Sequence, residues 1–146
     1  MKLATGIITA AFILVASGTA DALGNTIDFT KSCEDDLELV PGLNDYVLKA
    51  TCTGRDKQDY KTELSLNGCI ANNIQGGVME WKDPQGLFGT SCNKCSLSGK
   101  ERNLLTCACN ASNGKRESSQ INLDKGIGNN NGVLQCGSVS GTRSLT

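Results

Sequence analysis

The strongest constraint in this sequence is an internal repeat, in which Leu66 recurs as Leu123 at an offset of 57 residues. Apolar alternation, an Asn-rich turn and a closing apolar segment follow in the same order in both copies. The second copy is shorter in the turn, where Ile74 and Gln75 have no counterpart. Self-similarity at a fixed offset is typical of tandem supersecondary units. The matched segments are Leu64-Ser65-Leu66-Asn67 with Ile121-Asn122-Leu123-Asp124, Ile70-Ala71-Asn72-Asn73 with Ile127-Gly128-Asn129-Asn130, and 77–81 with 132–136.

The first residues have the pattern of a secretory signal peptide. Lys2 provides a basic start, residues 7–15 form an apolar run, and Ala20-Asp21-Ala22 has the small-x-small pattern of a cleavage site. The interpretation is a leader over 1–22 and a secreted, extracellular mature chain over 23–146. A membrane anchor is the alternative, but the run is short and interrupted for a bilayer span.

The mature chain is interpreted as one domain built from both repeats. Repeat one covers about 27–82, repeat two covers about 88–137, and a short C-terminal tail follows at 138–146. The Pro-containing and Gly-containing segment between the repeats is typical of a hinge. One repeat alone is marginal in size for a stable core, so the two are expected to pack together.

Eight cysteines in a secreted chain predict disulfides. Two pairs follow from equivalent positions in the repeats, a third is local, and the fourth joins the remaining two cysteines. A four-thiolate zinc site built from Cys92-x-x-Cys95 and Cys107-x-Cys109 is the alternative. The predicted pairs are Cys33–Cys52, Cys92–Cys109, Cys95–Cys107 and Cys69–Cys136.

Composition excludes several classes of function. The chain has no histidine, which removes the commonest general base and most catalytic zinc sites. Net charge is −1 and the basic residues are scattered, unlike a nucleic-acid-binding surface. We therefore expect no cofactor, no metal and no nucleic-acid partner. A hydrolase using paired carboxylates, either Asp56 with Asp59 or Glu80 with Asp83, is a possible enzyme but not the favoured one.

Local patterns predict β-strands joined by turns. Residues 62–66 and 118–123 alternate polar with apolar side chains, which is the period of a half-buried strand. Asn67 and Asp124 follow these strands and suit the start of a short helical turn, where a side chain caps free amides. The Asn-rich segments read as turns, since Asn tolerates positive φ. The fold class predicted from these patterns is all-β.

The doubled pattern resembles the cyanovirin-N homology family. Its parts are Phe-x-x-Ser-Cys at 29–33 and 88–92, a second cysteine at Cys52 and Cys109, and the matched segments above. The resemblance covers 29–136, and the extra cysteines are similar to those of its secreted fungal branch. It implies a pseudo-two-fold fold in which each repeat gives a triple-stranded sheet and a β-hairpin, with strand exchange between repeats and short helical turns. It also implies a monomeric lectin that binds mannose-type glycans without a cofactor.

The resemblance implies two carbohydrate-binding sites, each built from both repeats. Planar amides and hydroxyls suit adjacent sugar hydroxyls, which both donate and accept hydrogen bonds. Site one is the main site, and site two is expected to be weaker. Site one comprises Lys31, Ser32, Thr53, Arg55, Asn129, Asn130 and Asn131. Site two comprises Asn72, Asn73, Thr90, Ser91, Asn110, Ala111 and Ser112.

Several residues depart from the family pattern. Asn131 stands where an Asp is usual, and Lys31 and Arg55 replace commoner polar residues. Asn110-Ala111-Ser112 is also a glycosylation sequon, so a glycan on Asn110 would sit at the mouth of site two. These departures keep an alternative open, a secreted structural or interaction protein that has lost sugar binding. A domain-swapped dimer would depend on the short 82–87 connection.

Overall fold

The computed structural model describes residues 26–146, so the predicted leader over 1–22 lies outside the described residues. The described chain consists of short β-strands and single 3-10 turns, which confirms the all-β class. Within this part of the chain no helix has the length and apolar character needed to cross a membrane.

Each repeat contributes the same series: a 3-10 turn, three strands, a second 3-10 turn and a hairpin. Repeat one contains η1 (Phe29–Lys31), β2 (Glu38–Gly42), β3 (Asp45–Thr53), β4 (Asp59–Ser65), η2 (Leu66–Gly68), β5 (Ile70–Asn73) and β6 (Val78–Trp81). Repeat two contains η3 (Phe88–Thr90), β7 (Cys92–Ser98), β8 (Leu104–Asn110), β9 (Arg116–Asn122), η4 (Leu123–Lys125), β10 (Gly128–Asn130) and β11 (Val133–Cys136). The flanking strands are β1 (Thr26–Ile27), β12 (Val139–Ser140) and β13 (Thr142–Leu145).

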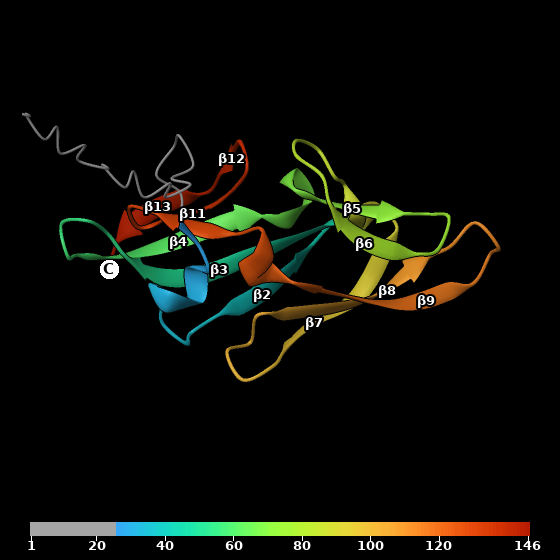
Figure 1. The fold of residues 1–146 in the computed structure, drawn as a ribbon, viewed down its shortest axis with the longest axis horizontal. Helices are drawn as coiled ribbons and strands as arrows, with labels where there is room; N and C mark the ends of the chain where they lie inside the picture. Colours follow the sequence, from blue (N-terminus) through green and yellow to red (C-terminus); the bar gives the residue numbers. More distant parts are fainter. Residues whose placement is uncertain (1–25) are drawn as a thin grey trace, which may run out of the picture.

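The strands form antiparallel sheets at the two ends of an elongated molecule (Figure 1). Strands β7, β8 and β9 form a three-stranded sheet, as predicted for each repeat. In repeat one, β13 adds to the edge of β4 and makes the order β13-β4-β3-β2. The repeat-one sheet therefore has four strands, because the segment predicted as a tail pairs with it.

Side chains at alternate positions of the middle strands form the hydrophobic core. In β4, Tyr60, Thr62 and Leu64 are buried, whereas the residues at 59, 61 and 63 are exposed. The alternation predicted over 62–66 is therefore present and begins earlier in the strand. Phe29 and Phe88 occupy equivalent positions in the two repeats, and both are fully buried in one continuous core. The two repeats thus share a single interior.

The hairpin of each repeat packs on the sheet of the other repeat. In Figure 1, β5 and β6 lie near β9, while β11 lies near β4. The backbone N–H of Met79 in β6 donates to Ser119 Oγ of β9 at 2.7 Å. At the equivalent place, Leu134 N–H in β11 donates to Thr62 Oγ1 of β4 at 3.0 Å. This matched pair of bonds confirms the predicted strand exchange.

Four disulfides join Cys33 to Cys52, Cys69 to Cys136, Cys92 to Cys109 and Cys95 to Cys107. These are the pairs predicted from the sequence. The zinc alternative is wrong, because its four sulfurs are bonded in pairs and none is a free thiolate. The Cys69–Cys136 bond crosses between the repeats, connecting the end of η2 to the end of β11.

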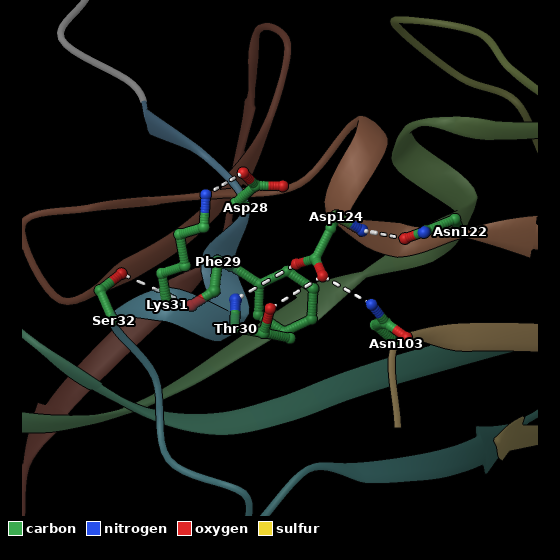
Figure 2. A network of polar contacts seen from close by, with 8 residues as sticks. All are labelled: Asp28, Phe29, Thr30, Lys31, Ser32, Asn103, Asn122 and Asp124. Carbon is green, nitrogen blue, oxygen red and sulfur yellow. Dashed lines mark hydrogen bonds and ion pairs between the residues drawn. The ribbon is translucent and has the colours of Figure 1, made fainter. Parts of the chain in front are cut away.

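Asn67 and Asp124 are the second residues of η2 and η4, and the side chain of each accepts hydrogen bonds from a 3-10 turn of the other repeat. Asp124 accepts hydrogen bonds from Thr30 N–H at 3.2 Å and Thr30 Oγ1 at 2.8 Å, both in η1 of the other repeat (Figure 2). Asn67 Oδ1 likewise accepts from Gly89 N–H of η3 at 2.8 Å. The predicted turns are present, whereas the predicted capping partners were wrong. The actual cap of η4 is Asn122, whose side chain accepts from Asp124 N–H.

The C-terminal segment is attached at two places. Strand β13 pairs with β4, where Arg143 lies opposite Thr62. Nearer its start, Ser138 donates from its N–H and its hydroxyl to the two carboxylate oxygens of Asp83, at 2.8 and 2.6 Å. These hydrogen bonds lower the pKa of the Asp83 carboxyl. The segment is therefore held to the linker between the repeats as well as to the first sheet.

We expect Asp83→Asn to reduce the acid sensitivity of the fold. Because the folded pKa of Asp83 is depressed, its contribution to stability is present above the ordinary value of 3.8 and is lost as pH falls through the folded pKa. The drop in thermal unfolding midpoint between pH 7 and pH 2 should thus be smaller in Asp83→Asn than in the wild type. Asp35→Asn is the matched control, since Asp35 is exposed. An identical drop in wild type and Asp83→Asn would contradict the prediction.

Candidate functional site

The two predicted sites occupy equivalent positions in the two halves. In each, the turn of a hairpin lies against the loop that follows the second cysteine of the other repeat. At site one, Arg55 N–H donates to Asn131 Oδ1 at 2.8 Å. At site two, Ser112 N–H donates to the Ile74 carbonyl at 2.6 Å. Strand exchange therefore brings together segments that lie far apart in the sequence.

Asn129 is the central contact of site one. Its Nδ2 donates to Ser32 Oγ at 3.0 Å and to the Thr53 carbonyl at 2.9 Å, and its Oδ1 accepts from Gly132 N–H at 2.8 Å. The side chain is 8% exposed. Its amide therefore joins the hairpin of repeat two to the sheet of repeat one, and these bonds use much of its polar capacity.

Asn72 makes the equivalent contacts at site two. Its Nδ2 donates to Ser91 Oγ and to the Asn110 carbonyl, both at 2.9 Å. Its Oδ1 is buried and has no hydrogen-bond partner among the described residues. The cause is the longer turn, because Gly77 N–H, the counterpart of Gly132 N–H, donates instead to the Asn73 carbonyl. The two inserted residues thus remove one bond from the repeated pattern.

The tip of the site-one turn is Asn131, which adopts φ 56°. Asn tolerates this left-handed conformation better than most residues. Its neighbour Asn130 donates from Nδ2 to Gln135 Oε1 at 2.8 Å, so that amide is directed along the hairpin. Lys31 forms an exposed ion pair with Asp28 at 2.7 Å, which lowers the pKa of the Asp28 carboxyl. The structure therefore gathers Ser32, Thr53, Arg55, Asn129 and Asn131, while Lys31 and Asn130 have other partners.

Three further residues lie at site one that were not assigned to it from the sequence, namely Tyr60, Arg143 and Asp56, the last of which was considered only for a hydrolase. Tyr60 OH donates to Asp56 Oδ2 at 2.5 Å, which lowers the pKa of Asp56 and raises that of Tyr60. The guanidinium carbon of Arg143 lies 4.0 Å from the centroid of the Tyr60 ring. Arg143 Nη1 also donates to the Asn131 carbonyl. In repeat two, Glu117 occupies the position that matches Tyr60. This difference between the repeats is the one sequence signal that could have indicated a special role for Tyr60 at site one.

Several residues predicted for site two have partners within the protein or are buried. Ala111 is buried, Thr90 Oγ1 donates to the Leu87 carbonyl, and Asn73 Nδ2 lies 3.4 Å from Glu80 Oε2. Beside it lies a polar hollow of about 200 Å³. Asn110, the acceptor residue of the sequon, is exposed and lines this hollow. Thr90, Ser91, Asn93 and Arg116 also contribute to its wall.

The carboxylates considered for an enzyme are held by separate partners. Asp56 accepts from Tyr60, whereas Asp59 accepts from Thr53 Oγ1 at 2.8 Å. Asp83 is bound by Ser138, and Glu80 is near Asn73. What both sites present instead is a set of amides, hydroxyls and, at site one, guanidinium groups. Such groups bind polar ligands reversibly through hydrogen bonds.

Fold and sites together define a duplicated, disulfide-bonded β-protein with two equivalent polar sites. The CVNH domain matches residues 29–135, and the protein belongs to this cyanovirin-N homology family. Members of the family are carbohydrate-binding lectins and not enzymes. A search of curated proteins found no match.

Solved structures with the same fold include three informative relatives. The protein in a microvirin:mannobiose complex is 32% identical, with a TM-score of 0.59 over 75% of this chain and 98% of that one. A MoCVNH3 variant in complex with (N-GlcNAc)4 is 20% identical, with a TM-score of 0.65 over 77% and 99%. The CVNH protein of Gibberella zeae is 21% identical, with a TM-score of 0.59 over 75% and 96%. The last two show the shared fold alone.

Proposed function

We propose that this protein is a secreted lectin that binds mannose-type oligosaccharides, mainly through site one. The observation that carries the proposal is the assembly of Ser32, Thr53, Arg55 and Asn131 around Asn129. Support also comes from the microvirin relative, whose structure is a complex with mannobiose. Four disulfides suit an oxidising, extracellular environment.

The chemistry of site one suits a shallow, hydroxyl-rich ligand. Asn129 is buried and Asp56 is exposed, but both are engaged in hydrogen bonds within the protein, Asn129 with Thr53 and Asp56 with Tyr60. The outer groups are the Asn131 side-chain amide and the Arg55 guanidinium, whereas the Ser32 hydroxyl already contacts Asn129 and the Phe29 carbonyl. Each outer group can exchange hydrogen bonds with water for hydrogen bonds with a sugar, with a modest net gain per bond. Affinity at one site is therefore expected to be modest, and a branched glycan spanning both sites would bind more tightly through effective concentration.

Asn131→Gly is expected to weaken the binding of mannobiose by about tenfold, because the outermost amide is lost. Glycine retains the left-handed backbone that the turn requires, so the fold should persist. Isothermal titration calorimetry measures the change. Asn73→Ala, in the turn of site two, is the matched control and should change the affinity little. Unchanged binding in Asn131→Gly would exclude site one as the main sugar site.

A second candidate, an interaction protein on the same scaffold with sugar binding lost, has one specific observation in its favour. The amides of Asn72 and Asn129 serve as bonds between the repeats, so a polar turn is needed for folding even without a ligand. A glycan array with the oxidised wild-type protein separates the two candidates. A specific signal supports the lectin, whereas a silent array supports the interaction protein.

A further inference from the structure

The edge of site one carries an arginine that comes from outside both repeats. Arg143 belongs to β13, which follows the matched family domain at 29–135. Pairing of β13 with β4 places its guanidinium over Tyr60 and next to Asn131. Stacking on an aromatic ring and a hydrogen bond to a fixed carbonyl hold the cation in one place. Arg143 is therefore an ordered part of the site.

Each oxygen acceptor around Arg143 already accepts one hydrogen bond from the protein. Asn131 accepts at its carbonyl from Arg143 and at its side-chain oxygen from Arg55 N–H. Asp56 accepts from Tyr60 OH at one oxygen and from Gln58 N–H at the other, at 2.5 and 3.1 Å. The remaining groups at this edge are mainly donors, namely the Arg55 guanidinium, the Asn131 amide nitrogen and the other N–H groups of Arg143. A donor-rich edge suits a ligand that brings acceptors.

The Arg143 cation acts on the Asp56 carboxyl, whose pKa is lowered mainly by the Tyr60 hydrogen bond and to a smaller extent by Arg143, but the two side chains do not form a salt bridge. Among the described residues, the salt bridges are Lys31 with Asp28 and Lys49 with Glu63, so neither arginine of site one takes part. Guanidinium groups bind phosphate, sulfate and carboxylate through paired hydrogen bonds. The equivalent position at site two lacks this arrangement, because Ser112 replaces Arg55 and Glu117 replaces Tyr60. In residues 26–146, no added strand pairs with β9 as β13 pairs with β4.

We propose that site one favours saccharides that carry an anionic substituent, and that Arg143 binds this substituent. The inference rests on the proposed function, since it names the ligand class of the same site. The sugar hydroxyls contact Asn131 and Arg55, while the phosphate, sulfate or carboxylate group lies against the outer N–H groups of Arg143. Neutral saccharides bind the same site without this last contact.

The test compares mannobiose with mannobiose that carries a 6-phosphate, each titrated into the disulfide-bonded protein by calorimetry. At low salt we expect the phosphorylated sugar to bind roughly three to ten times more tightly. Arg143→Gln should bring the ratio of the two affinities to about one, and this ratio is the readout because Arg143 also contacts Asn131 and Tyr60 of the site. Lys100→Gln, which removes the same charge from an exposed position in repeat two, is the matched control and should keep the preference. Inorganic phosphate alone, used as a competitor, reports plain anion binding.

Each outcome decides a different point. Equal affinity of the wild type for the two sugars, or a preference that survives in Arg143→Gln, would overturn the inference and leave the lectin function intact. Failure of both sugars to bind would overturn the proposed function itself. Competition by inorganic phosphate as strong as by the phosphorylated sugar would mean an anion site without sugar recognition, which also contradicts the inference. The salt dependence of the wild-type preference gives a readout that needs no variant. Raising the NaCl concentration to about 0.5 M, where exposed charges are strongly screened, should abolish the preference for the phosphorylated sugar.

Discussion

Loss of the Cys69–Cys136 disulfide is expected to lower the free energy of unfolding by about 4 kcal/mol in the chain-entropy model. The sequence separation of these cysteines is 67 residues, the longest among the four disulfides of the described chain. The bond also anchors the last strand of repeat two to repeat one. Cys69→Ala with Cys136→Ala removes it without burying a hydroxyl group. Urea unfolding under non-reducing conditions measures the change.

The matched control removes the Cys95–Cys107 disulfide by the same double substitution to alanine. Its separation of 12 residues predicts a smaller loss, about 3 kcal/mol by the same model. This bond joins β7 to β8 within one sheet, so the strands remain paired without it. A loss in the Cys95–Cys107 variant equal to or larger than that of the Cys69–Cys136 variant would contradict the prediction.

Repetition made much of the fold predictable from the sequence. Alternating side chains in β4 and β9 and cysteines at equivalent positions each specify local structure, and two copies reduce the chance of a coincidental pattern. The family resemblance, and not the repeat by itself, implied that strands are exchanged between the repeats. The bonds from Met79 to Ser119 and from Leu134 to Thr62 follow this symmetry.

Features without a counterpart in the other repeat could not be predicted in this way. Strand β13 is exposed along its length, so it has no apolar alternation, and its partner β4 lies far away in the sequence. The contact of Arg143 with Tyr60 depends on that pairing. Burial of Asn129 could not be predicted either, because the sequence pattern of a turn is the same whether its Asn binds a ligand or hydrogen-bonds within the protein.

Asp124→Ala is the second substitution for which we expect a large effect, a loss of about 3 kcal/mol in the free energy of unfolding. Asp124 is 6% exposed, and its carboxylate accepts from Thr30 N–H, Thr30 Oγ1 and Asn103 Nδ2 (Figure 2). Alanine leaves these donors without a partner in a place that water reaches poorly. Buried donors without partners lower the stability of the folded state. Loss of the carboxylate also removes the hydrogen bonds that join Thr30 of η1 to repeat two.

Asp124→Asn is the matched control, and repeat symmetry predicts its result. Asn67 occupies the equivalent position and holds Gly89 N–H with an amide oxygen, so an amide suffices for this role in the other half. We therefore expect Asp124→Asn to cost about 1 kcal/mol, because one oxygen acceptor remains for Thr30 N–H. Urea unfolding gives both values, and hydrogen exchange at the Thr30 amide reports whether η1 is released. If Asp124→Ala stays within about 0.5 kcal/mol of the wild type, as substitutions at ordinary surface positions do, the carboxylate does not hold the two repeats together.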